Sequence, residues 1–172
     1  MPRSFPFLAL LPASALLATF ALLGCGGPSF EGEVDVPDGY ATYRGNGVSF
    51  VHPAGWRPVT RELGKGITEV RFQGEGDAAV SLTVQAGVGD RFDPQLESER
   101  EVLETTAGAD VSQDEVDVPG ARKAYRSTIE SDSAKSQAVD VLTPDGRHLA
   151  LAAGGDDLDV DAVIGSLRLE ES

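Results

Sequence analysis

The sequence predicts an α+β domain in which an antiparallel sheet, built from hairpins, is covered by helices. Several short segments alternate apolar and polar residues, which is the pattern of half-buried strands. Pro-Gly and Pro-Asp-Gly sequences between such segments indicate tight turns. Two other segments, one between the strands and one near the C-terminus, carry helix signals. Strands in hairpins together with a few helices are typical of the α+β class.

The clearest strand is predicted in "AAVSLTVQAG", residues 78–87. Val80, Leu82 and Val84 share one face of this segment, and serine, threonine and glutamine side chains share the other. We therefore expect the three apolar residues to be buried. A register displaced by one residue would exchange the two faces.

Other strands follow from the same alternation and from turn signals. Residues 48–52 and 67–73 are each predicted to form a strand. Two hairpins are predicted further on, over residues 116–129 with a turn near "PG" and over residues 138–153 with a turn in "TPDGR".

Two helices are predicted from start signals and spacing. In "FDPQLESEREVLETTAG", Asp93 is the expected N-cap, Pro94 the first helical residue, and Gly108 the end. The second is a short amphipathic helix near the C-terminus, whose apolar residues stand at helical spacing: Val160, Val163, Ile164 and Leu167.

The composition excludes some classes of partner. The chain has 172 residues, a mass of 18.0 kDa and a formal net charge of -14. Its size allows one domain with a terminal extension. Because nucleic-acid binding needs clustered positive charge, we expect no nucleic-acid partner. The same acidity argues against a polybasic membrane patch.

Residues 1–24 are predicted to be a secretory signal peptide. Arg3 is the only charged residue before Cys25, and an almost wholly apolar run extends from residue 5 to residue 23. A short basic start followed by such a run is typical of a secretory signal. The alternative is a permanent membrane-spanning helix, since the run is near the minimum length. Pro6, Pro12 and the small residues around Cys25 favour a signal that is removed.

The end of this run, Leu22-Leu23-Gly24-Cys25, resembles the lipobox of bacterial lipoproteins, and Cys25 is the only cysteine of the chain. The resemblance implies a diacylglyceryl group on the Cys25 sulfur and cleavage just before this residue. It also implies a protein anchored in the cell membrane, at its extracytoplasmic face. Residues 25–42, rich in Gly, Pro and acids, are predicted to form the lipidated N-terminus and a flexible tether. Residues 43–172 then form the domain.

The stretches "YRGNGVSFVHPAGW" and "VDAVIGSLRL", together with the order of elements, resemble the PsbP-like family. The resemblance covers roughly residues 43–170 and implies an α/β/α sandwich. Members of this family are mostly non-catalytic binding or assembly modules. The residues that match are part of a turn and packing pattern: Tyr43, Phe50, Pro53, Gly55 and Trp56.

The sequence gives no complete catalytic, cofactor or metal motif, so we expect no cofactor. Asp157, Asp159 and Asp161 have the spacing of a calcium loop, but its later glycine and glutamate are missing, and helix capping explains the acids better. His52 and His148 are the only histidines, and neither has partners at a metal-binding or catalytic spacing.

Trp56, the only tryptophan, is expected to pack in the core, with the wall of an apolar ligand groove as the alternative. We therefore expect a non-catalytic envelope module that binds a protein or a small apolar ligand. The alternative is a cell-envelope enzyme such as a hydrolase, whose catalytic residues meet only in the fold.

Overall fold

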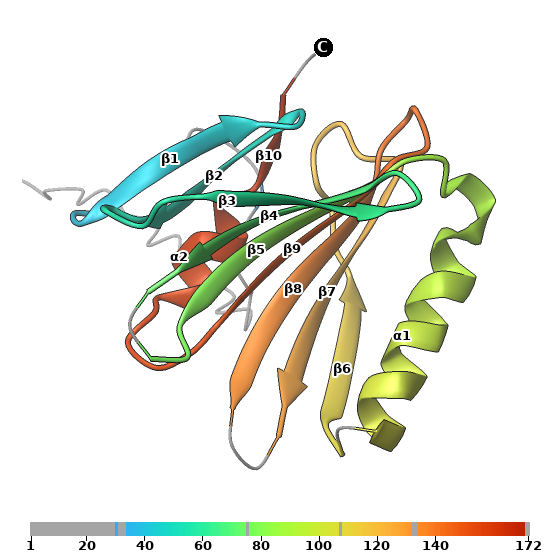
Figure 1. The fold of residues 1–172 in the computed structure, drawn as a ribbon. Coiled ribbons are helices and arrows are strands. Elements are labelled where there is room, and N and C mark those ends of the chain that lie inside the picture. The colour runs from blue at the N-terminus through green and yellow to red at the C-terminus, as the bar shows by residue number, and fades with distance from the viewer. Residues whose placement is uncertain (1–29, 31–33, 75, 107, 132–133, 171–172) are drawn as a thin grey trace, which may run out of the picture.

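The computed structural model of the chain describes Phe30 and residues 34–74, 76–106, 108–131 and 134–170. Ten strands and two α-helices form the domain in these residues (Figure 1). The strands are β1 (Tyr40–Gly45), β2 (Val48–Pro53), β3 (Val59–Gly64), β4 (Ile67–Gln73), β5 (Ala79–Gln85), β6 (Asp110–Glu115), β7 (Lys123–Glu130), β8 (Lys135–Leu142), β9 (His148–Gly154) and β10 (Arg168–Leu169). The helices are α1 (Phe92–Thr106), preceded by the 3-10 turn η1 (Gly89–Arg91), and α2 (Val160–Gly165).

The strands form two antiparallel sheets. The larger has seven strands in the order β3-β4-β5-β9-β8-β7-β6, and the smaller has three in the order β1-β2-β10. The main core lies between one face of the larger sheet and the layer made by the smaller sheet and α2. Val80 and Leu82 of β5 face this core with no exposed surface, and Val84 is partly buried against it. The predicted strand register is therefore confirmed.

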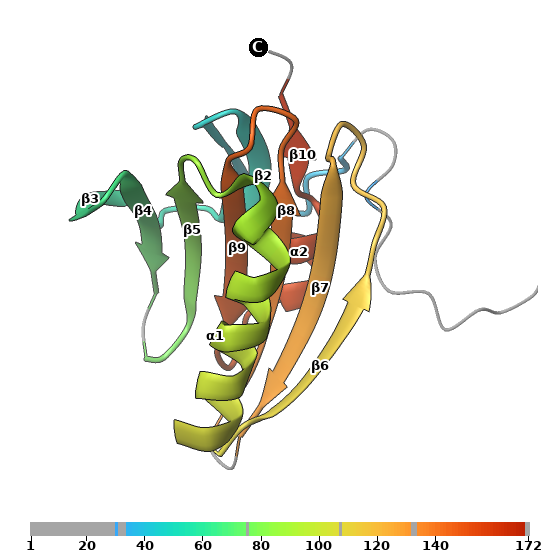
Figure 2. The same ribbon diagram turned by 90° about the vertical axis from the view of Figure 1, so that its right-hand side faces the viewer.

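The opposite face of the larger sheet carries α1 (Figure 2). Phe92 and Leu96 of the helix pack with Val88 and Leu142 in a second, smaller core. The helix was predicted to begin with Asp93 as its N-cap, but it begins at Phe92 because it continues directly from η1. The Asp93 carboxylate instead accepts a hydrogen bond from Lys123 of β7, with Nζ and Oδ2 at 2.7 Å.

The helix α2 confirms the prediction for the C-terminal segment. The Asp159 side chain accepts a hydrogen bond from the backbone N–H of Ala162 at 3.0 Å, as an N-cap does. Val163 and Ile164 are fully buried against the sheet. Leu167 is also buried, but it lies beyond the helix, just before β10.

Two of the strand predictions differ from the structure. The strand β3 was not predicted, because it is exposed along its whole length and so has no apolar alternation that marks a buried face. The 138–153 hairpin is confirmed by β8 and β9. The preceding hairpin is longer than predicted: β6 begins at Asp110, and residues 116–122 connect it to β7.

The domain also begins earlier than residue 43. The strand β1 starts at Tyr40 and pairs with β2 along its full length. Phe30, inside the predicted tether, is 3% exposed and belongs to the main core. Residues 1–29 and 31–33, with the predicted signal peptide and the rest of the tether's first half, lie outside the described residues.

Candidate functional site

Trp56 lies in the connection between β2 and β3. Its backbone N–H donates to the carbonyl of Pro53 at 3.3 Å, and Gly55 takes the positive φ of 90° that this turn requires. The indole is partly buried against the main core. A Cβ built at Gly74 would lie 2.2 Å from its Cζ2 atom. The predicted packing role is confirmed for this side of the ring.

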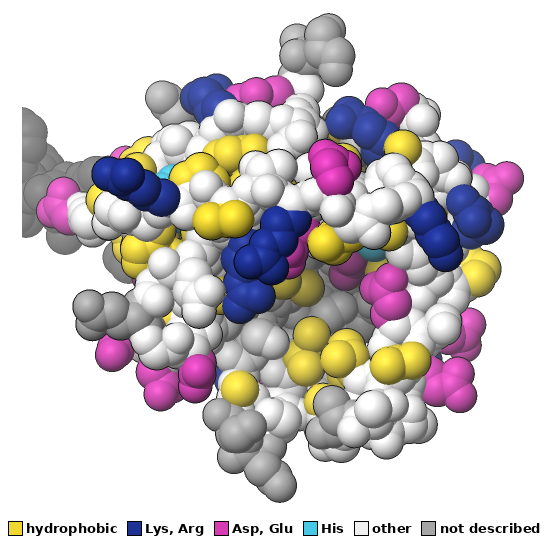
Figure 3. All heavy atoms as spheres, in the orientation of Figure 1, with side chains coloured by type: hydrophobic (Ala, Val, Ile, Leu, Met, Phe, Trp, Pro, Cys, Tyr) yellow, Lys and Arg dark blue, Asp and Glu magenta, His cyan; other side chains and the backbone are white. Residues whose placement is uncertain are grey.

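The rest of the indole borders an open depression of about 690 Å³. Three arginines also line it: Arg57 next to the tryptophan, Arg61 on β3 and Arg71 on β4. All three are exposed, and none of their side chains forms a hydrogen bond or ion pair with another described residue. In Figure 3, Lys and Arg side chains stand near the middle of one face of the molecule and at several places around its rim. The wall at Trp56 is therefore cationic, which does not fit the wholly apolar groove predicted as the alternative.

Strand pairing explains why sequence reasoning missed these arginines. In the β3–β4 ladder Arg71 pairs with Val59, and Arg61 pairs with Glu69. Val70 of β4 faces the core, so the next residue, Arg71, lies on the opposite face of the sheet. Arg61 lies on that same face, because it is paired with Glu69, the residue on the other side of Val70. Only the recognition of β3 as a strand could have shown from the sequence that the cations of the two strands lie together.

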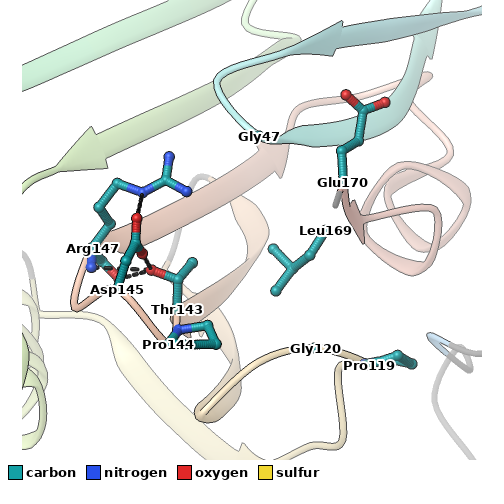
Figure 4. A pocket seen from close by; sticks show the side chains of 9 residues that line it. All are labelled: Gly47, Pro119, Gly120, Thr143, Pro144, Asp145, Arg147, Leu169 and Glu170. Atoms are coloured by element: carbon teal, nitrogen blue, oxygen red, sulfur yellow. Dashed lines mark hydrogen bonds and ion pairs between the residues drawn. The ribbon is translucent and has the colours of Figure 1, made fainter. Parts of the chain in front are cut away.

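A second open cavity, of about 570 Å³, lies where the β1–β2 turn, the β8–β9 turn and β10 meet (Figure 4). Each of its charged groups has a partner: Asp145 and Arg147 pair with each other, and Glu170 pairs with Arg44 outside the cavity. Arg147 Nε lies 2.7 Å from Asp145 Oδ2, and Arg147 also donates to the backbone carbonyl of Asn46 at 3.2 Å. A hydrogen bond from the Thr143 hydroxyl, followed by those from Arg147, holds the pKa of Asp145 below its usual value. This arrangement fastens the β8–β9 turn to the β1–β2 turn.

His148 forms a buried pair with Asp140 on the face of the sheet covered by α1. Nε2 of the histidine lies 2.8 Å from Oδ1 of the aspartate. The other ring nitrogen faces the side-chain amide of Gln95 at 3.5 Å, and the ring of Phe92 packs edge-on at 5.2 Å between centroids. Both ring nitrogens thus face side chains of the protein.

His52 lies apart from this pair, in the other core. Its ring packs against Phe72 with centroids 4.2 Å apart, and its Nδ1 lies 3.0 Å from the carbonyl oxygen of Pro53. Burial lowers the pKa of His52 from its usual value, and the Pro53 hydrogen bond opposes this only in part. The structure therefore does not bring the two histidines together.

The aspartates near α2 have separate structural roles. Asp159 caps the helix, as described, and Asp161 Oδ1 lies 2.7 Å from a guanidinium nitrogen of Arg126. Asp157 takes a positive φ of 63° in the preceding turn. Among the residues that the structure describes, no three His, Cys, Asp or Glu side chains converge on a point that could hold a metal ion.

Comparisons with known proteins add no relative. No protein-family model matches the chain, and no curated protein matches it. Cys25, the predicted lipidation site, precedes the described residues. Within the described part of the chain, neither helix is long and apolar enough to cross a membrane.

Proposed function

We propose that this protein is a lipid-anchored binding module, without catalytic activity, at the extracytoplasmic face of the cell membrane. The observation that carries the proposal is the sequence Leu22-Leu23-Gly24-Cys25 at the end of a long apolar run, in a chain with no other cysteine. Two acyl chains on one residue give a stable anchor, whereas a single chain gives a marginal one.

The position of Phe30 supports a domain held directly at the membrane. Phe30 follows Cys25 by five positions and is buried in the main core. A fully extended chain spans at most about 3.5 Å per residue, so this connection reaches about 17 Å. The connection between the lipidated residue and the folded domain is therefore much shorter than the predicted tether of residues 25–42, and Cys25 stays close to the domain.

The depression at Trp56 is the binding site that we propose. The arginines that line it have no carboxylate partner among the described residues, although the chain has a net charge of -14. An arginine that is left unpaired on an acidic protein is available to an outside anion. We therefore propose a partner with negatively charged groups, in place of the small apolar ligand that was one of the two kinds of partner expected from the sequence.

The arrangement of layers is compatible with the proposed relationship to the PsbP-like family. The helices α1 and α2 lie on opposite faces of the seven-stranded antiparallel sheet (Figure 2). Apart from the three-stranded sheet, which lies in the same layer as α2, this is the order of layers in an α/β/α sandwich. The relationship itself remains a proposal based on the sequence around Trp56 and at the C-terminal end.

The alternative function is a cell-envelope hydrolase, and the buried His148–Asp140 pair is the observation that favours it. In a hydrolytic triad the second ring nitrogen of the histidine faces the nucleophile. Here that nitrogen faces Gln95, and Phe92 packs on the ring. A pair enclosed in this way stabilises the contact between helix and sheet, so we prefer the binding function.

Metabolic labelling with a clickable fatty acid tests the anchor. We expect the wild-type chain to take up label and to partition into the detergent phase, because Cys25 carries the only thiol. The Cys25→Ser variant should take up no label and keep residues 1–24. Ser29→Ala, a change near the same position, is the matched control and should behave as the wild type. Label in the Cys25→Ser variant, or none in the wild type, would contradict the proposal.

A further inference from the structure

The β3–β4 hairpin and the turn before it carry six exposed side chains beside the partly buried Trp56. We call this group the β3–β4 patch; it consists of Trp56, Arg57, Val59, Arg61, Leu63, Lys65 and Arg71. The strand β3 is an edge of the seven-stranded sheet and is exposed along its length. In the described residues no strand or helix covers it.

The patch is cationic on a strongly acidic protein. The patch has three arginines and Lys65 but, among the described residues of β3 and β4, only one carboxylate on the same face, that of Glu69. Glu69 is opposite Arg61 in the β3–β4 ladder, and no ion pair joins the two side chains. The other nearby acid, Glu62, accepts a hydrogen bond from the hydroxyl of Thr68 at 3.0 Å. The local charge is therefore positive, while the net charge of the chain is -14. The sequence argues against a polybasic segment, but the fold assembles these cations from two strands.

The patch also exposes apolar side chains. Val59 and Leu63 are 52% and 58% exposed, and they are two of the four large apolar residues that are exposed in the described part of the chain. Trp56 adds an aromatic ring that is only partly buried. Tryptophan is enriched where a membrane meets water, and arginine and lysine bind anionic headgroups there. This combination fits a lipid surface better than it fits a small free anion.

The short connection to the anchor keeps the domain near the membrane, if the proposed lipidation of Cys25 is accepted. The chain from Cys25 to the buried Phe30 reaches about 17 Å, which is comparable to the radius of a domain of this size. The domain is therefore held near the bilayer, and its charge distribution decides which face turns toward the lipid. An anionic bilayer repels the acidic surface and attracts the β3–β4 patch.

We propose that the β3–β4 patch docks the anchored domain on anionic phospholipid headgroups. In this arrangement the guanidinium groups of Arg57, Arg61 and Arg71 bind lipid phosphates, and Trp56 lies at the level of the headgroups. Docking fixes the orientation of the domain on the membrane. The competing partner is an acidic peptide that pairs with the free edge of β3, and the test below distinguishes the two.

The test uses the full-length mature protein, purified from membranes in detergent and reconstituted into vesicles. Trp56 is the only tryptophan, so its fluorescence reports the patch alone. One set of vesicles contains phosphatidylcholine only, and the other contains equal parts of phosphatidylcholine and phosphatidylglycerol. Both contain a lipid with a fluorescence quencher on its headgroup. We expect several-fold stronger quenching in the anionic vesicles and loss of the difference at high salt, which screens exposed charges.

Two matched double variants complete the experiment. Arg61→Gln with Arg71→Gln should weaken docking by about fivefold for each arginine removed and abolish the difference in quenching. Arg100→Gln with Arg122→Gln removes the same charge from exposed sites outside the patch and should leave it intact. Equal quenching in both vesicle types, or an equal effect of the two double variants, would overturn the proposal. So would a shift of Trp56 emission with soluble oligoglutamate that anionic lipid does not produce.

The two proposals fail separately in this experiment. A chain without an acyl anchor will not sediment with the phosphatidylcholine vesicles, whether or not the β3–β4 patch binds anionic lipid. A chain that sediments with both vesicle types but shows no lipid-dependent quenching keeps the anchor and overturns the docking surface.

Discussion

His148 Nε2 and Asp140 Oδ1 lie 2.8 Å apart, in a pair that α1 encloses against the seven-stranded sheet. Asp140 is on β8 and His148 on β9, and the pair thus joins adjacent strands beneath the helix. Removing one partner of a buried polar pair leaves the other without compensation, which costs more than the pair itself contributes.

We therefore expect Asp140→Ala to lower the free energy of unfolding by about 3 kcal/mol. Chemical denaturation followed by circular dichroism measures this change. Asp114→Ala, at an exposed position of β6, is the control and should change stability by less than about 0.5 kcal/mol. Equal effects of the two variants would mean that the buried pair does not stabilise the contact between strands and helix.

Gly74→Ala should displace Trp56. The added Cβ would lie 2.2 Å from the indole, so the ring must move away from the core. We expect a loss of about 1 to 3 kcal/mol in stability, as for other overpacked sites, and a red shift of the tryptophan emission. Ser112→Ala, at an exposed position of β6 that does not line the Trp56 depression, is the control and should leave the emission unchanged. An unaltered emission in Gly74→Ala would show that the indole does not rest on this glycine.

Phe30→Ala tests whether the domain begins before β1. Because Phe30 is buried in the main core, its truncation should cost about 3 kcal/mol of unfolding free energy. Val36→Ala, which changes a side chain that is 44% exposed, should have little effect. Similar stability of the two variants would mean that this segment is a tether and not part of the folded domain.

His52 should make the protein less stable in acid. Burial lowers its pKa in the folded state, so between the usual value of 6.5 and the lowered one the unfolded chain binds a proton that the folded chain does not. The neutral, buried His52 therefore contributes fully to stability above pH 6.5, and this contribution is lost as the pH falls toward the lowered pKa. His52→Gln should therefore lose less stability than the wild type between pH 7 and pH 5. Parallel pH curves in urea denaturation would contradict this.

The fold could be predicted where burial leaves a periodic pattern. Val80 and Leu82 alternate with polar residues because one face of β5 meets the core, and "TPDGR" forms the β8–β9 turn through local backbone preferences. The strand β3 has no buried face, so its residues carry no such pattern. Phe30 stands among Gly, Pro and acidic residues, and only tertiary packing shows that it belongs to the core.

The candidate site could be predicted only in part for the same reason. Trp56 was recognisable as a single aromatic residue after a turn. The arginines beside it come from the turn, β3 and β4, and they meet because Arg71 pairs with Val59 and Arg61 with Glu69. Such a register depends on a strand that the sequence does not reveal.

The intact mass of the protein extracted from membranes is the most direct test of the proposed lipidation. We expect a chain that lacks residues 1–24 and carries a diacylglyceryl group on Cys25, with the added mass assigned to the N-terminal fragment after proteolysis. An unmodified chain, a chain that retains residues 1–24, or a mature N-terminus at any other residue would contradict it.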